Sequence, residues 1–144
     1  MKKFLLPIKQ FCSLLYGDTH DYFCALYDEV RLHFAIKLAD AKQRAYNKRY
    51  FVMPDYLNKL TVLNNDDIKW LKRAHLMKKN VTHLDIMRDC FYYTPLSRND
   101  EGSRMTVEER LKRKAKWLTH MEYVRTQLAR RKYAKLKNKR NGKK

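Results

Sequence analysis

Residues that end helices are rare in this chain, and their rarity limits the folds it can adopt. The sequence contains three glycines and three prolines among its 144 residues, and no proline follows Pro95. Folds built only from strands need frequent turns, which glycine and proline usually supply. With 44% hydrophobic residues the chain can still bury a modest core. The sequence therefore predicts one folded unit dominated by long helices.

Apolar side chains recur at helical spacing through the first third of the chain. Residues 3–16 show this spacing and Gly17 can end a helix, so we expect a first helix that lies on the core, a partner or a membrane surface. A second helix is expected from Thr19 to about Arg49. Its apolar stripe, which we expect to face the core, consists of Phe23, Leu26, Tyr27, Val30, Phe34, Leu38, Ala41 and Ala45.

A small β-sheet is predicted in the middle of the chain. Residues 50–53 and 60–63 are rich in β-formers and flank a longer loop, which indicates a hairpin, and residues 91–94 suggest a third strand. A helix capped by Asn65 or Asp66 should run to about Met77. Thr82 and Asp85 predict a capping box for a short helix that ends near Arg88. The expected fold class is mainly α with a small β-hairpin or three-stranded patch (α+β).

The last third of the chain predicts one long helix. Thr106 and Glu109 have the spacing of a capping box, and no glycine or proline follows until Gly142, so a helix should run from 107 to about 138. Its first turns carry an apolar face of Leu111, Leu118, Met121, Val124 and Leu128. The expected organisation is a helical and hairpin core domain at 1–95, a loop or hinge at 96–105, and a long basic amphipathic helix at 106–144.

Positive charge is concentrated at the C-terminal end of the chain. The formal net charge is +18, of which residues 106–144 contribute +12, from 15 basic and 3 acidic side chains. Such charge repels itself, and an anionic partner would relieve the repulsion. Candidate partners are nucleic acid, an acidic protein surface or an anionic membrane surface. The predicted polyanion-binding residues are Arg125, Arg130, Arg131, Lys132, Tyr133, Lys135, Lys137, Lys139 and Arg140.

The charge pattern of this last helix favours a polyanion over bulk water. Solvated helices usually alternate charge signs at positions four residues apart, but no carboxylate follows Glu122. Membrane binding is less favoured because the basic segment lacks a broad apolar face. Patterns typical of zinc fingers, basic zippers and RNA-recognition motifs are missing, so we expect contact with the nucleic-acid backbone without sequence-specific readout.

Motifs of enzymes are not found in this sequence. It has no nucleotide-binding glycine loop, no zinc-protease helix and no nucleophile elbow, so we expect no catalytic residues and no cofactor. The five histidines lack metal-ligand spacing, and Asp66 and Asp67 are better explained as helix-capping residues than as a metal pair. Three widely spaced cysteines fit free thiols in a reducing cytoplasm, and no segment is apolar enough to span a membrane.

The stretch ADAKQRAYNKRYFVMPDYLNKLTVLNNDDIKWLKR, residues 39–73, combines a helix with a basic end, a YFV-type strand, a second aliphatic strand and a short helix. This arrangement resembles small basic proteins of Bacteroidota and their tailed phages. The resemblance is limited to this stretch of the chain. It implies a phage-encoded protein that is a component of the virion, and it implies no catalytic residues.

These observations give two functional hypotheses. The first is a non-enzymatic structural or accessory protein of a nucleic-acid-containing assembly, such as a capsid or portal-proximal component of a phage virion. Its neighbours in that assembly would be other protein subunits, contacted through Phe4, Leu5, Ile8, Phe11, Leu111, Leu118, Met121 and Leu128. The alternative is a free DNA- or RNA-binding accessory protein in the host cytoplasm.

Overall fold

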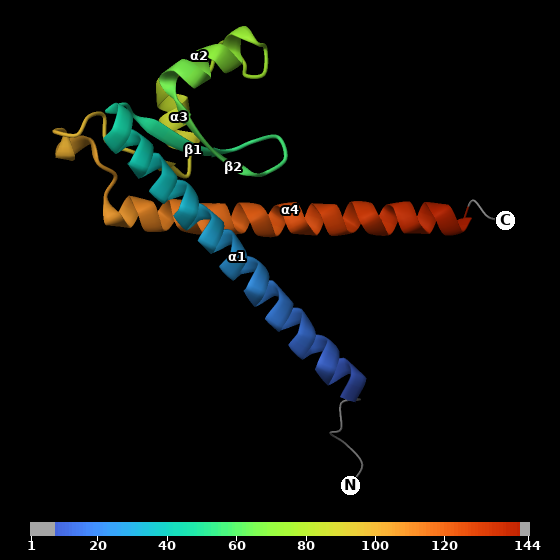
Figure 1. Cartoon of the computed structure of the whole chain (residues 1–144). Helices are drawn as coiled ribbons and strands as arrows, with labels where there is room; N and C mark the ends of the chain where they lie inside the picture. The colour runs from blue at the N-terminus through green and yellow to red at the C-terminus, as the bar shows by residue number, and fades with distance from the viewer. Residues whose placement is uncertain (1–7, 142–144) are drawn as a thin grey trace.

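Two long helices that cross beside a small antiparallel sheet make up the protein (Figure 1). The computed structural model describes the backbone of residues 8–141 and the side chains of residues 19–140. The elements are α1 (Ile8–Tyr46), β1 (Tyr50–Pro54), β2 (Leu60–Asn64), α2 (Asn65–Arg73), α3 (His83–Asp89), β3 (Tyr92–Tyr93), a 3-10 turn (Glu101–Ser103) and α4 (Val107–Asn141). The mainly helical fold with a three-stranded patch and a long C-terminal helix is confirmed.

The sheet separates two clusters of buried side chains. Its strand order is β2-β1-β3, and both pairs are antiparallel. Because successive side chains of a strand point to opposite faces, Tyr50 and Val52 of β1 join one cluster and Phe51 joins the other. The first cluster lies between the sheet and the two long helices. The second contains Ile68 of α2 and Ile86 of α3, so the fold has three layers.

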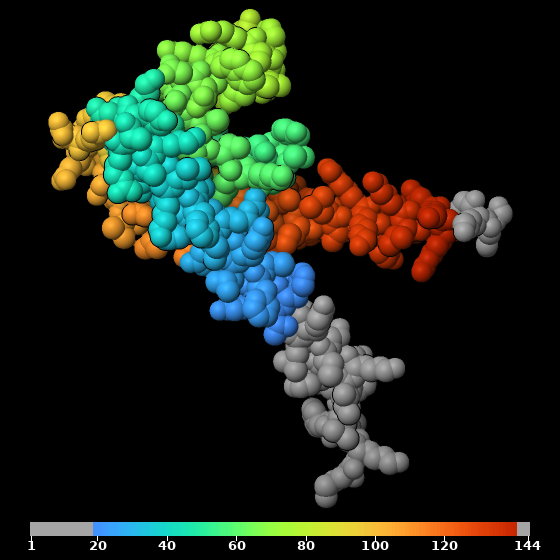
Figure 2. All heavy atoms as spheres, in the orientation of Figure 1, coloured from blue at the N-terminus to red at the C-terminus, as the bar shows by residue number. Residues whose placement is uncertain are grey.

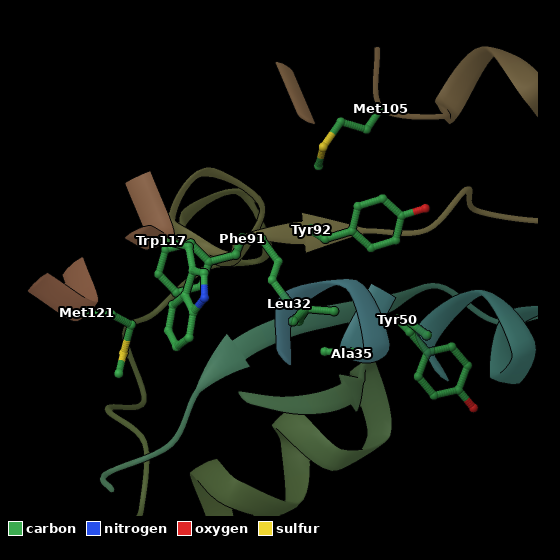
Figure 3. Close-up of a cluster of buried hydrophobic side chains, with 10 residues drawn as sticks. Leu32, Ala35, Tyr50, Phe91, Tyr92, Met105, Trp117 and Met121 are labelled. Atoms are coloured by element: carbon green, nitrogen blue, oxygen red, sulfur yellow. The ribbon is translucent and has the colours of Figure 1, made fainter. Parts of the chain in front are cut away.

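The larger cluster brings together side chains from α1, the sheet and α4 (Figure 3). Trp117 and Met121 of α4 lie beside Phe91, which precedes β3, and close to Leu32 of α1. Met105, which lies just before α4, is also buried in this cluster. The first half of α4 is therefore part of the core and packs against residues from both α1 and the sheet.

One continuous helix occupies the region where two were expected. The predicted stop at Gly17 is wrong, because α1 runs through it from Ile8 to Tyr46. A glycine inside a helix costs only about 1 kcal/mol relative to alanine, which helical residues on both sides can offset. The helix also ends before Arg49, because Asn47 has a φ of 52° and its N–H donates to the carbonyl of Gln43 at 2.8 Å.

The apolar stripe of α1 faces outward, contrary to the prediction that it faces the core. All eight of its residues are exposed, and Phe23, Tyr27 and Phe34 are each 65% exposed. Protein interiors are closely packed, so a helix that lies near a sheet needs small side chains at the contact. Ala39 meets that need and is completely buried. The buried side of α1 consists of Asp28, Leu32, Ala35, Ala39 and Gln43.

A pair of alanine substitutions tests the orientation of α1. Ala39→Leu should lower the free energy of unfolding by about 1–3 kcal/mol, because the larger side chain has no space against β1. Ala41→Leu makes the same chemical change at an exposed position and should alter stability by less than about 0.5 kcal/mol. Urea denaturation measures both, and a larger loss for Ala41→Leu would contradict the observed orientation.

Side-chain caps fix the two short helices. Asn64, rather than the expected Asn65 or Asp66, caps α2, and Asp67 accepts from the Asn64 N–H at 2.9 Å. This helix ends at Arg73 and not near Met77, because the left-handed His75, with a φ of 58°, interrupts it. The expected capping box at α3 is confirmed.

The segment 96–105 is a loop with a 3-10 turn, and it is fastened to the end of α1. The N–H of Arg98 donates to Asn47 Oδ1 at 2.8 Å, and its guanidinium donates to the carbonyl of Ala45 at 3.3 Å. Buried Arg49 donates to the carbonyl of Thr94 at 3.0 Å. A cation at a helix C-terminus also stabilises the helix dipole. These contacts hold the loop and the residues before it against the end of α1.

No helix within the described residues is apolar over the length that a membrane crossing requires.

Candidate polyanion-binding arm

Trp117 anchors the first half of α4. Its side chain has no exposed surface, and its indole Nε1 donates to the carbonyl of Asp28 in α1 at 2.9 Å. The ring meets Phe91 edge-to-face, with centroids 5.0 Å apart. A buried tryptophan needs a partner for its N–H, and here the backbone of α1 supplies it. Trp117 was not predicted from the sequence as a core residue, although its position directly before Leu118 on an amphipathic helix could have indicated burial.

Arg113 fastens α4 to the sheet side of the molecule. Its Nε donates to Glu109 at 2.7 Å, and its Nη1 donates to the carbonyl of Met87 at 2.7 Å. The guanidinium also lies 5.3 Å from the centroid of the Tyr93 ring. The N–H of Glu109 donates to Thr106 Oγ1 at 3.2 Å, as the cap prediction required, while its carboxylate pairs with Arg113.

A buried carboxylate fixes the point at which α4 crosses α1. Asp28 is 2% exposed and forms ion pairs with Arg31, at 3.4 Å, and with Arg125 of α4. Burying a charge is costly unless paired groups compensate it, and two guanidinium groups do so here. Arg125 was predicted to bind a polyanion, but the structure commits it to Asp28. It therefore serves to position the C-terminal part of α4.

Beyond Arg125, α4 continues as a segment that we call the basic arm, residues 126–141. Figure 2 shows it projecting past the tip of the hairpin. The arm carries seven basic side chains and no acidic one. Among residues 19–140, whose side chains the structure describes, no ion pair involves a cation after Arg125.

The remaining predicted polyanion-binding residues all lie on the arm and are exposed: Arg130, Arg131, Lys132, Tyr133, Lys135, Lys137, Lys139 and Arg140. Residues advance by about 100° each around a helix. Arg131, Lys135 and Lys139 therefore follow one another along one side of the arm. Arg130 and Lys137 lie on the opposite side. The arm thus presents cations around its whole circumference.

The predicted protein-contact residues fall into three groups. Leu111 and Leu128 are exposed and available to a partner. Met121 is buried in the core, and Leu118 packs partly against the same core. The reason is that Trp117 turns this side of α4 toward α1. Phe4 and Leu5 lie outside the described residues, as do the side chains of Ile8 and Phe11.

Asp85, His83 and Cys90 serve in capping and packing. Asp85 accepts from the N–H and the hydroxyl of Thr82 at 2.8 and 2.7 Å, and these hydrogen bonds lower the pKa of Asp85. The ring of His83 meets Phe51 edge-to-face at 5.3 Å. Burial raises the pKa of the Cys90 thiol to about 11, so it stays protonated. Within the described residues, no cluster of three or more His, Cys, Asp or Glu could hold a metal ion.

Comparison of this chain with protein-family models, curated proteins and solved structures gives no match. The function of the chain is therefore inferred from its own charges, burial and contacts.

Proposed function

We propose that this protein is a non-enzymatic structural or accessory component of a nucleic-acid-containing assembly, and that the basic arm binds the polyanion. This proposal is carried by one observation: seven cations lie on one helical segment that has no acidic residue. The resemblance of residues 39–73 to proteins of tailed phages suggests a virion, with a capsid or portal-proximal place in it.

Like charges along the arm favour a partner that neutralises them. Arg131, Lys135 and Lys139 are spaced four residues apart, and like charges at this spacing each destabilise a helix by about 0.2–0.5 kcal/mol. The core-facing part of α4 carries Glu108, Glu109 and Glu122, but the arm has no such compensation. Phosphate groups along a nucleic acid would remove this repulsion.

The distribution of cations around the arm favours a concave partner over a flat one. A flat anionic membrane can contact one side of a helix, which would leave Arg130 and Lys137 unpaired if Arg131 and Lys135 faced it. The major groove of duplex DNA is about 12 Å wide and accepts a helix of about 10–12 Å diameter between two rows of phosphates. Backbone contacts of this kind carry no sequence information.

The salt dependence of DNA binding tests the proposal. The full-length protein should bind duplex DNA of mixed sequence, and neutralising about six phosphates should give a plot of log K against log salt with a slope near −5. Fluorescence anisotropy with labelled duplexes, titrated at several salt concentrations, measures this slope. Two unrelated duplex sequences should give equal affinities. A slope near zero, or no binding at low salt, would exclude the arm as a polyanion-binding segment.

A further inference from the structure

An open groove of about 1120 Å³ lies between α1, the loop that joins β1 to β2, and α4. Part of the outward-facing apolar stripe of α1 lines this groove. The α1 wall is formed by Tyr27, Phe34 and Leu38, and the α4 wall includes Val124 and Leu128. Apolar surface left exposed in one continuous patch commonly marks an interaction site.

The loop that forms the third wall is held in a defined position. Asp55 Oδ1 accepts from the N–H groups of Leu57 and Lys59 at 2.7 and 2.9 Å, which shapes the turn. The carbonyl of Asn58 accepts from Arg31 of α1 at 3.1 Å. The side chain of Asn58 is 3.1 Å from His120 of α4, so the loop is tied to both long helices.

Two apolar side chains of this loop take no part in these contacts and are exposed to solvent. Tyr56 is 90% exposed, and Leu57 is also exposed, although both line the groove. The loop is fixed by polar contacts, so these two side chains add no packing energy to it while they face water. Their position at the rim suits contact with a partner that occupies the groove.

The charges around the groove are all positive. None of its lining residues is acidic, whereas five are Lys or Arg. Arg31 and Arg125 are engaged with the buried Asp28. Lys42, Lys59 and Arg131 form no ion pair within the described residues and remain for a ligand. The groove therefore combines an apolar floor with an uncompensated basic rim.

We infer that this groove binds an amphipathic, acidic α-helix of a partner protein. Apolar side chains of that helix would enter between α1 and α4, and carboxylates on its flanks would pair with Lys42, Lys59 and Arg131. The groove follows α1 from Tyr27 to Lys42, which at 1.5 Å per residue is about 22 Å, the length of a helix of about 15 residues. Grooves of this kind recognise apolar side chains that recur every three or four residues along one face of the bound helix.

Two other occupants fit the groove less well. A second copy of this chain would bring another formal charge of +18 against a basic rim. Single-stranded nucleic acid would find aromatic rings at Tyr27, Phe34 and Tyr56, but most of the apolar lining is aliphatic, and base stacking needs aromatic surfaces. Aliphatic side chains instead favour the leucines and isoleucines of a protein helix.

The inference is tested with three labelled peptides of about 15 residues, the length derived from the groove. The first has leucines at helical spacing flanked by glutamates, the second has lysines in place of the glutamates, and the third has serines in place of the leucines. Fluorescence anisotropy with the full-length protein should show at least about tenfold tighter binding of the first, equivalent to about 1.4 kcal/mol. Equal binding of the second or third peptide, or no binding of the first, would refute the inference.

Substitutions then locate the binding site. Phe34→Glu combined with Leu38→Glu should weaken binding of the acidic peptide at least about tenfold, and both positions are exposed, so folding should be retained. Leu76→Glu with Leu84→Glu also places two glutamates at exposed apolar positions, here outside the groove, and should leave binding nearly unchanged. A comparable loss in this control would contradict the assignment.

The variant with Phe34→Glu and Leu38→Glu also distinguishes a protein helix from the two other occupants, single-stranded nucleic acid and a second copy of the chain. Loss of single-stranded oligonucleotide binding without loss of peptide binding would assign the groove to nucleic acid and overturn the inference. Dissolution of a concentration-dependent dimer, detected by sedimentation, would assign it to a second copy and also overturn it. The Phe34→Glu and Leu38→Glu variant should keep the salt slope for duplex DNA, since neither residue lies on the arm. Leu128 and Arg131 belong to both sites, whereas Phe34 and Leu38 line the groove alone, so this variant tests the groove independently of the arm.

Discussion

Replacing Arg130, Arg131, Lys132 and Lys135 by glutamate is expected to lower the affinity for duplex DNA about 1000-fold. Each residue is an exposed cation on the basic arm, and losing about 1 kcal/mol at each of four contacts amounts to about 4 kcal/mol. The new carboxylates would also repel phosphates. Anisotropy titrations at low salt measure the change, because screening reduces it at higher ionic strength. The core formed by residues 19–94 should remain folded, since all four substituted positions are exposed.

A matched variant tests whether DNA binding depends on where these charges lie or only on the net charge of the protein. Changing Lys37, Lys78, Lys79 and Lys116 to glutamate also removes eight units of positive charge, from +18 to +10, at exposed positions away from the arm. We expect this variant to retain most of its DNA affinity, because its losses are distant from the bound phosphates. If both variants lost affinity equally, general attraction by net charge would explain binding and the arm would have no special role.

Trp117→Ala is expected to lower the free energy of unfolding by about 3–5 kcal/mol, the largest loss of stability that we expect from any single substitution in this chain. The indole is fully buried, and its removal leaves a cavity between Phe91 and Leu32. It also removes the hydrogen bond from the indole N–H to the carbonyl of Asp28, where α4 crosses α1.

The second tryptophan of the chain supplies the control for this measurement. Trp70 lies on α2 and is 59% exposed, so Trp70→Ala should change stability by less than about 1 kcal/mol. Urea denaturation followed by circular dichroism compares the two variants without relying on tryptophan fluorescence. Equal losses at the two positions would show that Trp117 does not anchor α4 as described.

The contrasting burial along α4 divides it into an anchored half and a free half. The anchored half, from Val107 to Arg125, contributes Trp117 and Met121 to the core and pairs with Asp28. The free half carries exposed cations, and Leu128 near its start lines the groove. A rigid helix that is held at one end can present its cations at a distance from the core, while the groove beside the anchor point remains open to a protein partner. Such a division suits a component that joins protein subunits to nucleic acid.

Local signals in the sequence were sufficient for much of the fold. The hairpin, the third strand, the cap of α3 and the long helix after Thr106 were all predicted, because each depends on residues close together in the chain. The basic arm belongs to this group as well. Its charge is a property of composition, and the scarcity of glycine and proline determines that it is helical.

Only the tertiary structure decided which side of each long helix is buried. The largest apolar side chains of α1 predicted a core-facing stripe, yet Leu32, Ala35 and Ala39 face the core instead. The burial of Asp28 depends on Arg125, which is 97 residues away in sequence. The spacing of apolar residues shows that a helix has an apolar side. Which side becomes buried depends on packing against segments that are distant in the sequence. The exposed stripe and the groove beside it are the consequence.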